Sequence, residues 1–255
     1  MISNEQEIIA AVDKGNVNTM NDALFKFVLG KDDAKRLTIN FLNAVVGPNL
    51  LNPIEDLTFL QTEDYPERVM GRETRFDAAC RLNSGERINV IVQMPGRNNT
   101  RQQVLRRWTD MYSILMFSQA FQSTYRSSSP LFMVNILDFV LFEEDPNPYS
   151  SWGIQNIVTH QRCPVGTDLA LFFLEIPKYE GLPRSGSNLS PIERWMCYFS
   201  PRIPLQEKNT LLSDEVMQET LNRTKHFFNN EIERRRYIDA EIARMNDESA
   251  LKGGL

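Results

Sequence analysis

Apolar positions at helical spacing open the chain and predict two consecutive helices. The first is expected to start after Thr19, an acceptable N-cap, and to stop at Gly30, which favours helix ends. The second is expected to start at Asp32 or Asp33 and to close at Gly47-Pro48. The apolar positions that define them are Leu24, Phe25, Val28, Leu37, Phe41 and Val45. The sequence thus predicts a helical hairpin packed on a larger body.

Strand patterns follow from Ile54 onward. Residues 54–60 read as a short strand, and residues 74–82 and 88–94 alternate in polarity around the turn Asn83-Ser84-Gly85. A hairpin with this turn is expected to place Asp77 opposite Gln93, and Ile91 opposite Ala79, on one face.

The remaining periodicity completes an α/β chain. A long helix is predicted over 98–122, buried strands over 131–142 and 169–177, a helix over 191–199, and a final amphipathic helix from Ser213. We therefore expect a mixed central β-sheet flanked by helices, with extra helices at the C-terminus. The expected divisions are an extension at 1–18, a main domain at 19–200, and a helical extension at 201–255.

Composition narrows the class of protein. The 255 residues are 42% hydrophobic and 24% charged, which fits one globular domain with peripheral helices. Neither a signal peptide nor a membrane anchor is visible near the N-terminus, so a cytoplasmic location is expected. Cys80, Cys163 and Cys197 are odd in number and widely spaced, and they are expected to be buried thiols. His160 and Cys163 lack the second pair that structural zinc requires.

Charge is locally uneven. The formal net charge is −5, which excludes a globally basic nucleic-acid binder. Between Arg87 and Asp110, however, there is no acidic residue, and several arginines fall in this window. Arg97 and Arg101 are expected on the apolar side of the long helix, toward the end of the sheet, whereas Arg106 lies nearly opposite and is expected to face solvent.

These patterns converge on one constellation. Asp77 in mid-strand, the amide of Gln93 on the paired strand, and the arginines of the next helix form an arrangement suited to phosphodiester cleavage. Magnesium binds through one or two carboxylates, and Arg97 and Arg101 would hold adjacent phosphates. From spacing alone this signal is weak, because a strand aspartate is more often a satisfied polar residue.

The chain resembles the PD-(D/E)XK nuclease-family transposases, also described as recombination-promoting nucleases (Rpn). The likeness runs from about Asn21 to Phe199. The fragments that carry it are Asp22-Ala-Leu-Phe-Lys26, Phe41-Leu-Asn43, Arg75-Phe-Asp77, Val92-Gln93-Met94, Ile136-Leu-Asp-Phe139 and Pro191-Ile-Glu-Arg-Trp195. Each fragment is unspecific alone, whereas their order and spacing together are specific.

The resemblance implies a restriction-endonuclease-like core and DNA cleavage that depends on Mg²⁺ or Mn²⁺. In the family pattern an aspartate on the first strand matches Asp77, and a Glu-x-Gln element on the second strand matches Gln93. Its glutamate position is Ile91, which cannot bind a metal. Substitute carboxylates are sought at Glu55 or Glu63.

The resemblance also allows Asp22, Lys26 and Arg75 to reach the active cleft, although Asp22 and Lys26 could simply pair on a helix surface. DNA is the expected partner, with no membrane and no nucleotide cofactor, and the final helix would suit a homodimer. Three hypotheses stay open: an impaired Mg²⁺-dependent endonuclease, a degenerate nuclease fold that binds DNA or protein, and a purely structural oligomerisation domain.

Overall fold

The computed structural model describes residues 4–50, 52–59, 68–69, 72–73, 78–82, 87–93, 106, 109, 131–161, 169–182 and 188–252. Its helices are α1 Asn4–Asp13, α2 Asp22–Leu29, α3 Lys35–Val45, α6 Ile176–Glu180, α7 Pro191–Phe199, α8 Leu205–Leu211, α9 Glu215–Asn229 and α10 Glu231–Lys252, with short 3₁₀ turns at Asp32–Ala34 and Gly47–Asn49. Most of the long helix expected over 98–122 lies outside the described residues. Within that range the structure describes Arg106 and Thr109, and both are helical.

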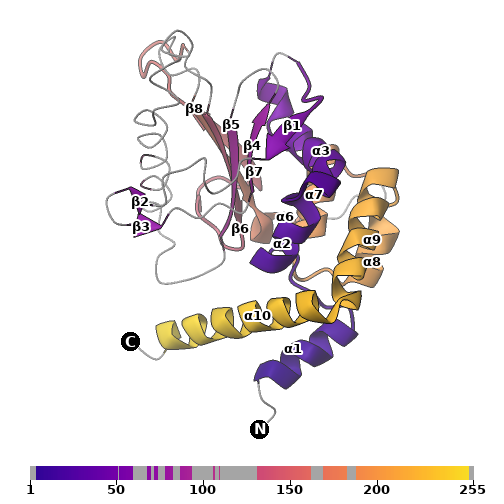
Figure 1. Cartoon of the computed structure of the whole chain (residues 1–255). Coiled ribbons are helices and arrows are strands. Elements are labelled where there is room, and N and C mark those ends of the chain that lie inside the picture. The colour runs from indigo at the N-terminus through magenta and orange to yellow at the C-terminus, as the bar shows by residue number, and fades with distance from the viewer. Residues whose placement is uncertain are drawn as a thin grey trace.

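A six-stranded mixed sheet forms the centre of the molecule (Figure 1). Its order is β1 (Leu57–Phe59), β4 (Ala78–Leu82), β5 (Arg87–Gln93), β6 (Leu131–Leu137), β8 (Leu169–Glu175) and β7 (Tyr149–Gly153). β5, β6 and β8 are parallel, and the outer strands are antiparallel to their neighbours. A separate two-stranded ribbon joins β2 (Arg68–Val69) to β3 (Arg72–Glu73). The predicted mixed sheet flanked by helices is confirmed.

The strand predictions succeeded where side chains are apolar. β6 ends at Leu137, before the expected limit of 142, because the following residues turn away from the sheet. β7 was not predicted, since Tyr-Ser-Ser-Trp-Gly lacks an apolar alternation. It is an edge strand that pairs with β8 through its backbone, which leaves its sequence weakly constrained.

The first helical hairpin is confirmed, but its N-cap is Asn21 instead of Thr19. The Asn21 side chain accepts from Ala23 N and Leu24 N, and its Nδ2 donates to Glu241 Oε1 at 2.9 Å. Thr19 is buried, and its hydroxyl donates to the Tyr198 carbonyl at 2.6 Å. Both residues can cap a helix, and only tertiary contacts decide between them.

Aromatic side chains fill the space between the helices and the sheet. Trp195 on α7 is fully buried, meets Phe41 edge to face at 5.2 Å, and donates through Nε1 to Asn40 Oδ1 at 3.0 Å. Ser190 and Glu193 form a capping box at the start of α7. The core cluster continues from Ile8 near the N-terminus to Ile238 in α10, so both ends of the chain join one apolar interior.

The final amphipathic segment forms two helices instead of one. α9 ends at Asn229, and the side-chain Oδ1 of its C-cap, Asn230, accepts from Ile232 N and Glu233 N and so starts α10 in a new direction. α10 lies beside α1 (Figure 1), and Arg234 bonds Asp13 at 2.7 Å across that contact. Ile232 continues the helical spacing of Met217, Leu221 and Phe228 in the sequence, but it is 67% exposed because the helix breaks before it.

Two of the three cysteines are described, and both Cys80 and Cys197 are buried free thiols as predicted. Burial raises the pKa of the Cys80 thiol to about 12. Cys163 lies outside the described residues. Among the helices that the structure describes, none is long and apolar enough to cross a membrane.

Lys208 of α8 is an unusual buried cation. Its side chain is fully buried, with Nζ 3.4 Å from Thr19 Oγ1 and 5.6 Å from the centre of the Tyr198 ring. Burial lowers its pKa to about 7, because the low-dielectric surroundings disfavour the charged form. Glu180 and Cys197 offset this only partly.

We predict that Lys208→Met stabilises the protein at neutral pH. The folded pKa is depressed from 10.5 to about 7, so the unfolded chain binds more protons between these values and wild-type stability rises with pH across that window. The variant lacks this cost, so its advantage in urea unfolding should be largest below about pH 7 and shrink toward pH 10. Lys225→Met, at an exposed position of α9, is the control and should show no such trend. A constant difference between Lys208→Met and wild type at all pH values would contradict the prediction.

Candidate active site

The carboxyl ends of β5, β6 and β8 meet at one edge of the sheet, which we call the carboxyl edge. Gln93 pairs with Leu137, and Leu137 pairs with Glu175, so the last residues of the three strands are adjacent. β4 is antiparallel to β5, which turns its first residue, Ala78, toward the same edge. Ligands of open α/β sheets bind beyond the carboxyl ends of parallel strands. The carboxyl edge is therefore where a site would be built.

The hairpin register differs from the predicted one. Ala79 pairs with Asn89, and Ala78 pairs with Val90, so the expected pairing of Ile91 with Ala79 is wrong by two residues. A two-residue shift leaves every side chain on its original face, and polarity alternation alone cannot detect it. The register depends on the length of the turn. The expected pairing of Asp77 with Gln93 cannot be compared, because Asp77 lies outside the described residues.

Several of the predicted site residues lie outside the described part of the chain, namely Asp77, Arg75, Glu63, Arg97 and Arg101. Gln93 and Ile91 are described by their backbone, as the last and third-last residues of β5. Ile91 pairs with Asn135 in the centre of the sheet.

Glu55 lies at the wrong end of the sheet to join Gln93. It is exposed and precedes β1, whose first residue Leu57 pairs with Leu82, the last residue of β4. Ala78, toward the carboxyl edge, is at the opposite end of β4. Asn43 fixes this position by exchanging two hydrogen bonds with the Ile54 backbone, at 2.8 and 2.9 Å. The structure does not bring Glu55 to the carboxyl edge.

Asp22 and Lys26 form an ion pair of 2.7 Å on the surface of α2. The two side chains are 57% and 44% exposed, and their i to i+4 spacing is the ordinary geometry of a helix-surface pair. This is the structural alternative considered from the sequence.

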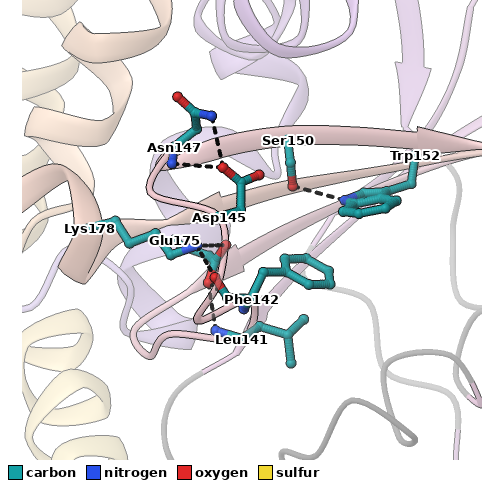
Figure 2. A network of polar contacts seen from close by, with 8 residues as sticks. All are labelled: Leu141, Phe142, Asp145, Asn147, Ser150, Trp152, Glu175 and Lys178. Atoms are coloured by element: carbon teal, nitrogen blue, oxygen red, sulfur yellow. Dashed lines mark hydrogen bonds and ion pairs between the residues drawn. The ribbon is translucent and has the colours of Figure 1, made fainter.

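Glu175, at the end of β8, is a buried carboxylate with a full set of partners (Figure 2). Oε1 accepts from Leu141 N at 2.6 Å and Phe142 N at 3.0 Å, and Oε2 pairs with Lys178 Nζ at 2.7 Å. Lys178 Nζ also donates to the Phe142 carbonyl at 2.6 Å. The ion pair therefore fastens the β6–β7 connection to the sheet, and Glu175 acts as a structural group.

Aromatic contacts hold the same connection. Phe142 lies 5.1 Å from both Phe173 and Trp152, and Trp152 Nε1 donates to Ser150 Oγ at 3.0 Å (Figure 2). Asp145 accepts from the backbone and side chain of Asn147, and these bonds lower the pKa of its carboxyl. The segment between β6 and β7 is thus organised by its own polar and aromatic contacts.

Asp138 is the other carboxylate that the structure describes beside the strand ends. It directly follows β6 and is half-buried, one residue beyond the partner of Gln93. No group of three or more His, Cys, Asp or Glu side chains able to hold a metal occurs among the described residues. The described residues alone do not make a metal site, and Asp77 would have to complete one.

Sequence reasoning missed two buried polar groups near the site. Asn135 is fully buried in the middle of β6, in register with Ile91, and its Nδ2 donates to the Phe172 carbonyl at 3.2 Å. Glu175 is the second. Each interrupts an otherwise apolar strand, and such an interruption is the signal that could have identified it, because buried polar groups require partners.

Comparison with family models supplies the classification. The model of the PD-(D/E)XK nuclease family transposases matches residues 19–254. The chain belongs to this family. Its mixed α/β sheet with flanking helices is consistent with the restriction-endonuclease-like fold. Comparisons with curated proteins and with solved structures gave no match.

We predict that Glu175→Gln destabilises the protein by about 3–5 kcal/mol, because Lys178, 9% exposed, would remain charged without its partner. The glutamine carbonyl can still accept from the loop amides, so the loss reports on the ion pair. Urea unfolding measures it.

Removing both charges in Glu175→Gln/Lys178→Met should recover most of the lost stability. Glu143→Gln, at an exposed position of the same connection, is the matched control and should change little. A double variant no more stable than Glu175→Gln would show that the Lys178 charge is not the cause.

Proposed function

We propose that this chain is a Mg²⁺-dependent DNA endonuclease of the recombination-promoting type, whose cleavage is impaired because Ile91 replaces a metal-binding glutamate. The observation that carries the proposal is the family match over 19–254, which includes the strand hairpin expected to hold the site. The parallel register supports the proposal, since β5 ends with Gln93 at the carboxyl edge.

Asp77 and Gln93 are the proposed site residues, with Asp77 as the metal ligand. Asp138 is the described carboxylate best placed to join them, because it follows the strand paired with Gln93. Glu175 is a poor substitute, since both of its oxygens are engaged. A bound divalent cation would supply Lewis-acid chemistry at the scissile phosphate.

Arg97 and Arg101 are the proposed phosphate-binding residues. The sequence between Arg87 and Asp110 contains no acidic residue, so this window attracts a DNA backbone even though the net charge of the chain is −5. This part of the proposal does not require catalysis. It would hold equally for a degenerate nuclease that binds DNA without cutting it, which is the alternative that Ile91 favours.

We predict that Ile91→Glu increases nicking of supercoiled plasmid in Mg²⁺ or Mn²⁺ by at least about 100-fold over wild type, because it returns a carboxylate to an electrostatically organised site. Calorimetric titration of the same variant should show tighter Mn²⁺ binding.

Ile91→Gln is the control, since glutamine has nearly the same size as glutamate and no charge. It should give no increase in nicking. Adding Asp77→Ala to Ile91→Glu should remove the gain. If Ile91→Glu binds Mn²⁺ but cuts no DNA, the chain is a binding module and the endonuclease proposal fails.

We further predict that Arg97→Ala and Arg101→Ala weaken DNA binding for all sequences alike. Each should reduce the slope of log affinity against log salt by about 1 in fluorescence anisotropy, because one phosphate contact is lost. Arg106→Ala is the matched control, since Arg106 is exposed and expected on the other side of the helix. Equal effects from all three variants would show that DNA affinity depends on the total positive charge and not on phosphate contacts of Arg97 and Arg101.

A further inference from the structure

α1 (Asn4–Asp13) precedes the part of the chain that the family model matches, which begins at residue 19. It lies against α10 (Figure 1), and Ile8 is its one buried side chain. Ile9 and Val12 are partly buried against the same apolar interior. A helix of 10 residues is marginal in water without packing, so α1 is helical only while it stays docked.

Two ion pairs hold α1 on α10, one near each end of α1. Asp13 pairs with Arg234 at 2.7 Å, and Glu5 pairs with Arg235. The four side chains are between 34% and 58% exposed. Exposed pairs of this kind contribute little each and are screened by salt, because water and counterions surround both charges. Part of the attachment of α1 therefore depends on ionic strength.

The packing beneath α1 is open on both sides. A cavity of about 460 Å³ is lined by the end of α1 together with α8 and α9, and a second cavity of about 280 Å³ is lined by α1 and α10. Val17 lines both cavities, with Val12 in the first and Ile8 in the second. Atoms that line a cavity have no partner on one side, so they gain less from dispersion than close-packed atoms do. The apolar contacts that hold α1 are accordingly few.

The chain is anchored more firmly from Asn18 onward. Asn18 N donates to the Tyr237 hydroxyl at 2.7 Å, and the Asn21 side chain donates to Glu241 at 2.9 Å. Tyr237 and Glu241 are buried, so these bonds are shielded from water and salt. The linker of residues 14–17 is also bonded to α8. The boundary between the weakly held and the firmly held segment therefore lies at the end of α1.

We propose that α1 is an electrostatic strap, a unit that lifts from α10 while the chain from Asn18 onward stays folded, in a population that ionic strength controls. Lifting deprives Arg234 of its α1 carboxylate and leaves Arg235 paired with Asp239 on α10 itself. The lifted state therefore presents more positive charge on α10, and anions favour it over the docked state.

The strap is independent of the proposed nuclease activity. The ion pairs and the two cavities involve α1, α8, α9 and α10, whereas the proposed site is built at the ends of the central strands. A lifted α1 loses its helix, because it is too short to persist alone, and its backbone amides then exchange with solvent. Amide exchange in α1 therefore reports how often the strap lifts.

Hydrogen exchange of the full chain, followed by mass spectrometry, tests the proposal. The amides of α1 should exchange at least about 3-fold faster in about 1 M than in about 0.01 M NaCl, because the Debye length falls from about 30 Å to about 3 Å and both ion pairs are screened. The amides of α7, which carries the fully buried Trp195, should show no such change and serve as the internal reference.

Arg234→Gln/Arg235→Gln should make α1 exchange at least about 3-fold faster at the low salt concentration and should remove the salt dependence, since both ion pairs are gone. Arg236→Gln is the matched control. It removes the next arginine of the run, whose partner Glu233 is on α10 itself, and α1 should exchange as in wild type. Ile8→Ala should speed exchange of α1 at least about 10-fold at both salt concentrations and leave α7 unchanged, as expected of a separate unit.

The proposal is overturned if α1 exchanges no faster than α7 in wild type and in Ile8→Ala, because α1 would then open only when the whole domain unfolds. It is equally overturned if the salt dependence persists in Arg234→Gln/Arg235→Gln, or if Arg236→Gln accelerates exchange of α1 as much as that double variant does.

Discussion

Three adjacent parallel strands impose the main constraint on this structure. β5, β6 and β8 cannot be joined by tight turns, and their side chains need cover on both faces of the sheet. α2, α3 and α7 supply that cover on one face, where their buried side chains join those of the strands in one core, and α9 packs against α2 and α3. The same parallel direction brings Gln93, Leu137 and Glu175 to one edge. The position of the candidate site is therefore a consequence of strand direction.

At that edge a structural carboxylate and a proposed catalytic one have different surroundings. Glu175 is buried, and a buried carboxylate requires compensation, which Lys178 and two loop amides provide. A metal-binding carboxylate needs oxygens left open to a cation. The full coordination of Glu175 explains why this residue is a poor substitute for the carboxylate that we propose is missing at Ile91.

Much of the fold could be predicted from sequence because apolar residues recur in its main helices and strands at helical or strand spacing. The helix over 191–199 and the strands at Leu131 and Leu169 have apolar patterns that follow directly from burial on the sheet. The register of the β4–β5 hairpin could not be predicted, because shifts of two residues preserve polarity. β7 was not predicted because an edge strand is stabilised by backbone hydrogen bonds and its sequence needs no apolar alternation. The choice of Asn21 over Thr19 as N-cap depends on Glu241, more than two hundred residues away.

That last contact bears on how the chain is made. The first residues of the family domain lead into α2, yet the side chain of its N-cap is held by Glu241, which is synthesised 220 residues later. Tyr237 on the same helix accepts the Asn18 amide through its hydroxyl at 2.7 Å. These two contacts can form only after α10 has been synthesised. A product that stops before α10 therefore lacks contacts at the beginning of the domain as well as at its end.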